Sequence, residues 1–220
     1  MNYVKTITLS VIIILSGCSE EDLCLKGSGT VNEYPLTINN FDEVSLYGPV
    51  NLRLRQGSEL TVSVDAEPEI FSELSYEVKD GVLEIGFKQN ISCFETDQGV
   101  WINATVPDLR TIYQSGISEI LSDGDINFDQ LNLYVSGTAD IMLSGQVETH
   151  KIVSSGLLNT NNFNFLTKNT TVDISGTAEM ELSCSDKLDI KVEGLATIYY
   201  KGHPEITNSS SGSLQLIDSN

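Results

Sequence analysis

The 220-residue sequence predicts an all-β protein built as a parallel β-helix-like solenoid with coils of about nineteen residues. Three observations support this. Glycine recurs in the C-terminal half at intervals of 21, 19, 20, 18 and 18 residues. Apolar and polar residues alternate with period two in many short runs, and no amphipathic helical stretch of useful length is present. The recurring glycines are Gly116, Gly137, Gly156, Gly176, Gly194 and Gly212.

Residues 1–17 are predicted to be a signal peptide and lie outside the folded domain. Ile7 to Leu15 is an apolar stretch too short to span a bilayer as a helix. The following Leu15-Ser16-Gly17-Cys18 resembles the lipobox of bacterial lipoproteins, in which the cysteine carries the lipid. The alternative is an ordinary secretory signal with a chance cysteine. We therefore predict lipidation at Cys18 and attachment to a membrane through that lipid.

Residues 18–30 are predicted to form an acidic tether. Ser19-Glu20-Glu21-Asp22 looks like the export signal that sends Bacteroidetes lipoproteins to the outer face of the outer membrane. A merely solvated linker is the alternative interpretation. The expected location is the outer membrane, on the cell surface.

Residues 31–110 are predicted to form a β-rich N-terminal portion, continuous with the solenoid or packed on it. Strand patterns begin near Val44, Val50, Leu60 and Val82, and Asp80-Gly81 is a hairpin signal between two such runs. The segment from Glu67 to Val78 is expected to hold a helical turn that opens with Pro68 and buries Ile70, Phe71 and Leu74.

Residues 111–220 are predicted to form the repeat portion, with three short strands in each coil. Aligned on the glycine, the residues four before, two after and four after are mostly Ile, Leu, Val, Ala or Met, so these columns are expected to face inward. A small polar residue precedes most of the glycines, and we expect a corner there beside a residue that is free to take a positive φ. The polar run from Asn208 to Ser211 predicts a capping terminal coil.

The residues three after each glycine predict an outward polar ladder with neighbours about 4.8 Å apart. The candidate ligand or cation ladder is Glu119, Asp140, Asn159 and Glu179. One interpretation is a Ca²⁺-assisted binding ridge, because hard cations prefer oxygen ligands. The other is a solvated face held by hydrogen bonds, and Asn159 interrupting the acids favours it.

Three cysteines remain after Cys18. Cys24 and Cys93 flank the N-terminal portion and are the expected disulfide, with Cys184 buried as a small apolar side chain. Two other pairings are open. No pair has the spacing of a zinc or redox site.

The formal net charge of −19 argues against nucleic acid as a partner. No nucleophile elbow, P-loop or dinucleotide motif occurs, so no catalytic residues are assigned and an enzyme is not expected. A glycan or protein ligand and an oligomer through the stacked ends stay open.

Several phrases resemble the putative autotransporter adhesin, head-GIN domain family. They are Gly27-Ser28-Gly29-Thr30-Val31, Phe41-Asp42-Glu43-Val44, Gly48-Pro49-Val50-Asn51-Leu52, Gln56-Gly57, Val106-Pro107-Asp108-Leu109 and the repeated Ser-Gly-x-Ala/Ser-acid-Ile. The resemblance implies a right-handed β-helix-like fold, common in Bacteroidetes lipoproteins, without an established activity. Gly48-Pro49 departs from the expected turn, so the first coil is expected to differ.

The sequence thus indicates a cell-surface lipoprotein with an adhesin-like or scaffold role. The alternatives are a carbohydrate-active enzyme on a β-helix scaffold and a structural spacer or sensor module of the envelope.

Overall fold

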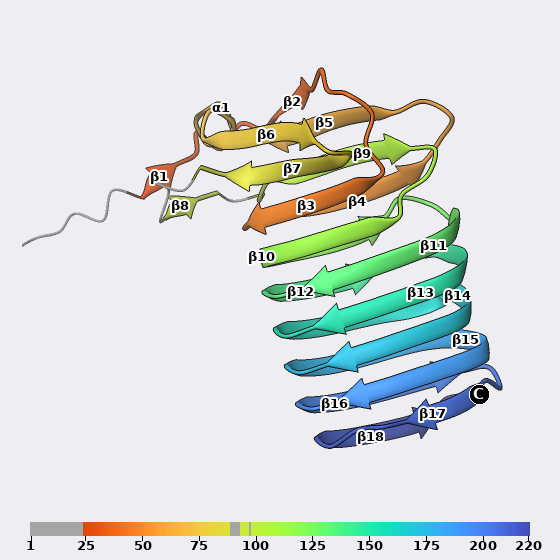
Figure 1. Ribbon diagram of the computed structural model, residues 1–220. Helices are drawn as coiled ribbons and strands as arrows, with labels where there is room; N and C mark the ends of the chain where they lie inside the picture. Colours follow the sequence, from red (N-terminus) through yellow and green to blue (C-terminus); the bar gives the residue numbers. More distant parts are fainter. Residues whose placement is uncertain (1–23, 89–92, 97) are drawn as a thin grey trace, which may run out of the picture.

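The computed structural model describes residues 24–88, 93–96 and 98–220. The expected signal peptide and the expected lipidation site at Cys18 lie outside these residues. The described chain is a β-solenoid whose coils stack along one axis, with the N-terminal strands at one end and β18 (Ser213–Asp218) at the other (Figure 1). Coils of 18 to 21 residues agree with the predicted architecture.

The N-terminal strands belong to the same stack as the repeats. Strand β3 (Glu43–Gly48) pairs in parallel with β10 (Thr111–Ser122) and with β7 (Val82–Phe87). Strand β4 (Asn51–Gln56) pairs in parallel with β10 and with β9 (Trp101–Val106). The N-terminal portion is therefore continuous with the solenoid.

Antiparallel strands close the N-terminal end of the stack. Strand β5 (Thr61–Ala66) pairs with β9, β2 (Asn32–Pro35) pairs with β5, and β6 (Leu74–Lys79) pairs with β7. These pairings cover edges that would otherwise expose unpaired N–H and C=O groups.

Local features of this end follow the sequence signals. Asp80 and Gly81 turn the chain between β6 and β7 with φ of 52° and 84°, which is the geometry that a tight hairpin needs. The expected helical turn is α1 (Pro68–Phe71), and Ile70 within it is fully buried.

A disulfide fastens the start of the described chain. Cys24 and Cys93 are bonded, with their Cα atoms 4.7 Å apart. Beside the bond, β1 (Leu25–Lys26) and β8 (Phe94–Glu95) form a separate two-stranded parallel sheet. Cys184 is buried and forms no disulfide within the described residues.

The repeat portion consists of parallel strands that follow one another down the stack. They are β10, β11 (Ile126–Val135), β12 (Thr138–Met142), β13 (Gly145–Ser154), β14 (Leu157–Ile174), β15 (Thr177–Val192), β16 (Leu195–Lys201), β17 (Glu205–Asn208) and β18 (Ser213–Asp218). Long strands such as β14 bend around the corners of the coil. Each therefore pairs with a neighbouring coil along three separate segments.

We name the three sides of the stack by these paired segments. Face A is the five residues after each repeat glycine, from 117–121 to 213–217. Face B is formed by residues 126–128, 145–147, 165–167, 182–184 and 200–201. Face C is the segments that lead to each glycine, from 111–114 to 205–208.

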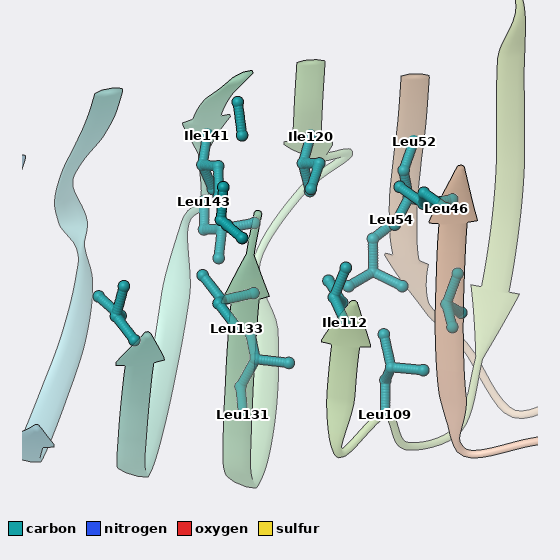
Figure 2. Packing of buried hydrophobic residues seen from close by; sticks show 14 of the residues in the cluster. Leu46, Leu52, Leu54, Leu109, Ile112, Ile120, Leu131, Leu133, Ile141 and Leu143 are labelled. Atoms are coloured by element: carbon teal, nitrogen blue, oxygen red, sulfur yellow. The ribbon is translucent and has the colours of Figure 1, made fainter. Parts of the chain in front are cut away.

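The predicted columns are in register. Ile112, Leu133, Ile152, Val172 and Ile190 pair in succession on face C, and all are buried. Figure 2 shows Leu131 and Leu133 beside Ile112 and near Ile141 and Leu143 in the interior. Burial of these side chains is the main favourable contribution to folding, at about 25 cal/mol per Å² of apolar surface.

The repeat glycines are required by the stacking of one coil on the next. A Cβ atom on any of the six would lie 1.8 to 2.3 Å from the carbonyl oxygen of the glycine one coil earlier, counting Gly48 as the first of the column. That oxygen accepts a hydrogen bond from the residue after the next glycine, as in Leu157 N–H to Gly137 O at 2.9 Å.

The freedom of these glycines to take a positive φ is used at one position. Among the six, only Gly116 has one, at 156°, so contact with backbone rather than backbone conformation selects glycine. The first coil, which was expected to differ at Gly48-Pro49, keeps the pairing of the later coils and differs in backbone conformation. Gly48 pairs with Gly116 in the same column, although its own φ is 78°.

The interior of the middle coils contains polar side chains as well. His150 is 1% exposed and stands in a column between Leu131 and Thr170. Its Nδ1 lies 2.8 Å from the Leu131 carbonyl oxygen, to which it donates a hydrogen bond, while Nε2 has no partner among the described residues. Burial of the ring lowers the His150 pKa from 6.5 to about 4.

Replacing one repeat glycine tests the stacking contact. We expect Gly156→Ala to lower the free energy of unfolding by more than about 3 kcal/mol, because its Cβ would overlap backbone that cannot move independently. Urea unfolding followed by circular dichroism measures the change. The exposed neighbour provides the control, since Ser155→Ala should change stability by less than about 0.5 kcal/mol. Equal effects of both variants would contradict the stacking argument.

The buried histidine predicts a stability loss at acid pH. Above pH 6.5 it is neutral in both states, and below 6.5 the unfolded chain takes up a proton that the folded chain refuses until about pH 4. Its contribution to stability should therefore fall by roughly 3 kcal/mol between pH 6.5 and 4. Urea unfolding of His150→Leu across this range should show a shallower pH dependence than that of the wild type. His203→Gln alters an exposed ring and should leave the slope unchanged.

Candidate functional site

The predicted ladder is a continuous line on the outside of face A. Glu119 pairs with Asp140, Asp140 with Asn159, and Asn159 with Glu179, and the column continues through Thr197 and Gln215. The three acids are exposed and Asn159 is half-buried. The structure therefore brings all four candidate residues together in chain order.

Hydrogen bonds organise this ladder. The Asn159 side-chain amide donates to Asp140 Oδ1 at 2.9 Å, and the Glu119 backbone N–H donates to Asn51 Oδ1 at 2.8 Å. Within residues 24–88, 93–96 and 98–220, no group of three or more His, Cys, Asp or Glu side chains lies close enough to hold a metal ion. The Asn159 amide thus provides a hydrogen-bond donor to the Asp140 carboxylate within the ladder.

Exposed apolar side chains flank the ladder on both sides. The column directly after the glycines presents Ile117, Leu157 and Leu195, which are 66%, 45% and 57% exposed, and Met142 stands on the other side. Two shallow hollows of about 470 and 300 Å³ lie along the ladder and meet at Asn159. Face A is therefore a strip in which an acidic line runs between two partly apolar lines.

Three aromatic side chains near the surface, Tyr113, Tyr134 and Trp101, contact other groups of the protein. Tyr113 and Tyr134 stack on each other with centroids 5.2 Å apart. Lys151 lies over Tyr134, and Arg53 covers the Trp101 ring at 3.9 Å. The Tyr113 hydroxyl donates to Glu43 at 3.1 Å, and burial, reinforced by that carboxylate, raises the Tyr113 pKa. These rings are less available to a ligand than an isolated aromatic face.

A recess on face B has a volume of about 650 Å³. Its walls come from five successive coils. Lining side chains are Asn127, Phe128, Asp129, Gln146, Val147, Glu148, Phe163, Leu166, Thr167, Lys168, Ser183, Cys184, Ser185 and Lys201, together with Gly202.

An irregularity in the repeat positions this recess. Asn161 of β14 pairs with Glu181 of β15, and the next pair is Leu166 with Ser183. Four residues of β14 therefore lie between these two pairs, but only one residue of β15. The additional residues carry Phe163 out beside the recess. Between Thr167 and Asn169 the difference is reversed, because β15 has one residue more than β14 there. The net difference of two residues explains why the glycine interval falls from 20 to 18 residues.

Side chains satisfy the backbone groups that the irregularity leaves unpaired. The Ser183 hydroxyl donates to Phe163 O at 2.7 Å, and the Thr167 hydroxyl donates to Ser183 O at 2.9 Å. The Cys184 thiol lies 3.1 Å from Lys187 O and 3.3 Å from Lys168 O. Bonded in this way, the floor of the recess is a fixed part of the fold.

Both signs of charge line the recess. Lys168 forms an ion pair with Glu148, and this contact raises the Lys168 pKa. Lys201 lies 4.2 Å from the centre of the Phe163 ring and forms no ion pair with any described carboxylate. The Lys201 ammonium is thus held by a ring face and is available to a ligand.

Sequence reasoning did not find the face B recess. The available signals were the change in glycine interval and Leu166, an apolar residue at an outward position that is 55% exposed. Neither signal gives the depth of the recess, because that depends on how the two coils of unequal length pack.

No helix in the described ranges is long and apolar enough to cross a membrane.

None of the curated proteins is detectably similar to the chain in sequence. Solved structures do show the same fold. The chain is similar to a putative adhesin from Bacteroides fragilis, with a TM-score of 0.69, 16% identity and coverage of 87% of this chain and 99% of that one.

It is also similar to a putative adhesin from Parabacteroides distasonis, with a TM-score of 0.55, 18% identity and coverage of 88% and 99% of the two chains. The model of the family described as putative auto-transporter adhesin, head GIN domain, matches residues 40–204. Those residues include all of the solenoid from β3 to β16. The chain therefore belongs to the putative auto-transporter adhesin, head GIN domain, family.

Proposed function

We propose that this protein is an adhesin-like lipoprotein of the cell surface, anchored by lipid on Cys18, which binds a partner protein through face A. The observation that carries the proposal is the exposed apolar column of Ile117, Leu157 and Leu195 beside the acidic ladder. The family is labelled adhesin-like rather than enzymatic, which supports a binding role.

Face A has the size of a protein-binding strip. Its six segments are about 4.8 Å apart, so the strip is about 24 Å long, and columns two residues apart are separated by about 6.6 Å. Flat, in-register arrays of this kind suit an extended surface better than a small molecule.

The charge of the strip selects the chemistry of the partner. The face A segments contain Glu119, Asp140, Glu179 and Glu181 and no Lys, Arg or His. A partner with apolar side chains and Lys or Arg between them would complement it, whereas a second copy of face A would be repelled. A neutral glycan would gain little from the acids.

The anchor would leave face A accessible. Strand β1, which begins directly after Cys24, lies at the N-terminal end of the stack (Figure 1). Lipid on Cys18 would therefore hold that end at the membrane, and the repeat coils would project away from it. A single acyl chain gives only weak, reversible membrane binding, so stable attachment through Cys18 would need more than one chain.

The anchoring proposal predicts the effect of removing one sulfur atom. Cys18→Ser should release the protein from the membrane fraction into the soluble fraction, and incorporation of labelled palmitate should be lost. Cys184→Ser, a buried cysteine elsewhere, should leave both readouts unchanged. Retention of Cys18→Ser in the membrane fraction, with the same surface labelling as wild type, would contradict lipid anchoring.

The binding proposal predicts which face matters. Beads carrying the full chain should be retained on basic, apolar members of an immobilised protein array, and Ile117→Ser/Leu157→Ser/Leu195→Ser should weaken retention at least about tenfold. Retention should fall with salt, because the acids contribute, and should persist after Ca²⁺ is removed by EGTA.

Leu166→Ser provides the matched control, since it removes an equally exposed leucine from face B. Binding only to a glycan array, release of reducing ends from a glycan, or equal losses with Leu166→Ser and the triple variant would overturn the proposal.

A further inference from the structure

We propose that the recess on face B is a binding site for a small organic anion with an apolar body, separate from face A. The site does not depend on the adhesin-like function, because none of its lining residues lies on face A. Its volume of about 650 Å³ lies within the usual range for small-molecule sites, which is about 300 to 1,000 Å³.

One outward column forms the length of the recess. Asn127, Gln146, Leu166, Ser183 and Lys201 pair in succession from β11 to β16. Four ladder steps give a length of about 19 Å. The recess is therefore elongated along the axis of the solenoid.

A gap in side chains creates the space near its C-terminal end. Ser183 is small, and its hydroxyl is turned back to Phe163 O. Gly202 follows Lys201 and has no side chain, and a Cβ there would lie 2.0 Å from Cys184 O. Between Leu166 and Lys201, over about two ladder steps, the outward column thus carries only the small, buried side chain of Ser183.

The surfaces around this gap are apolar. Leu166 is 55% exposed on one side, the ring of Phe163 flanks it, and the buried side chains of Phe128, Val147 and Cys184 lie beneath. An apolar ligand body covering Leu166 and Phe163 would remove this surface from water, which favours binding.

The charges set the orientation of the ligand. Lys201 is the cation at the C-terminal end, on the face of Phe163 and without an ion pair among the described carboxylates. Asp129 lies at the opposite end, on β11, and Glu148 is already paired with Lys168. A carboxylate, sulfonate or phosphate is therefore attracted to the Lys201 end and repelled from the other.

The experiment uses 1-anilinonaphthalene-8-sulfonate, which has an apolar body and one anionic group and fluoresces when bound. The full chain carrying Cys18→Ser, which removes the expected lipid, should bind it, and dodecanoate should compete. Dodecanol, the neutral counterpart, should compete at least about threefold less well, because it lacks the charge that Lys201 attracts.

Variants locate the binding. Leu166→Ser and Phe163→Ala should each weaken binding about tenfold, and Lys201→Ala about threefold to fivefold. Leu157→Ser and Lys151→Ala are matched controls on faces A and C and should bind as wild type. Circular dichroism confirms that each variant is folded.

Four results would overturn the proposal. The first is that the folded full chain does not bind the probe, and the second is that Leu166→Ser and Phe163→Ala bind it as wild type does. The third is that Leu157→Ser loses as much probe binding as these variants. The fourth is that dodecanol and dodecanoate compete with the probe equally well. Sedimentation with phosphatidylglycerol vesicles that depends on Lys201 would also overturn it, since the anion would then be a membrane surface rather than a free molecule. Failure of the full chain to be retained on the protein array, with probe binding intact, would reject the face A proposal alone.

Discussion

The contact between each repeat glycine and the carbonyl oxygen of the glycine one coil earlier determines how the coils of this protein stack. The oxygen accepts a hydrogen bond from the next coil, so it points along the stack into the position that a Cβ would occupy. Only a residue without a side chain fits there. Because the contact recurs from Gly48 to Gly212, every coil is fixed in the same register at one corner.

A fixed register turns a weak sequence repeat into continuous columns. Once the glycines are aligned, Ile112 must lie under Leu133 and Glu119 beside Asp140, whatever the remaining residues are. Inward columns then bury apolar side chains coil by coil, and outward columns present the same kind of group at intervals of about 4.8 Å. The regular strip of face A is a direct consequence, and it favours binding to an extended surface.

A different kind of surface arises where the repeat is irregular. The coil that contains Phe163 is two residues longer than the next, and the difference is accommodated by bulges on face B. The buried Thr167, Ser183 and Cys184 side chains bond the backbone groups that lose their ladder partners. These bonds compensate several backbone groups at the irregularity, although the buried Asn162 Nδ2 has no partner among the described residues, and the irregularity leaves a recess that a regular solenoid would lack.

The sequence by itself determined the fold class, the inward columns, the order of Glu119, Asp140, Asn159 and Glu179, the Asp80-Gly81 hairpin and the helical turn at Pro68. These features depend on local alternation and on a period that is visible along the chain. Only the tertiary structure decided why the glycines are needed, since the clash involves backbone about twenty residues away, whereas local reasoning offered only the freedom of glycine to take a positive φ. It also decided that the N-terminal strands continue the stack and that His150 is buried. The face B recess likewise depends on tertiary structure, because its depth comes from packing two coils of unequal length, and no single stretch of residues carries that information.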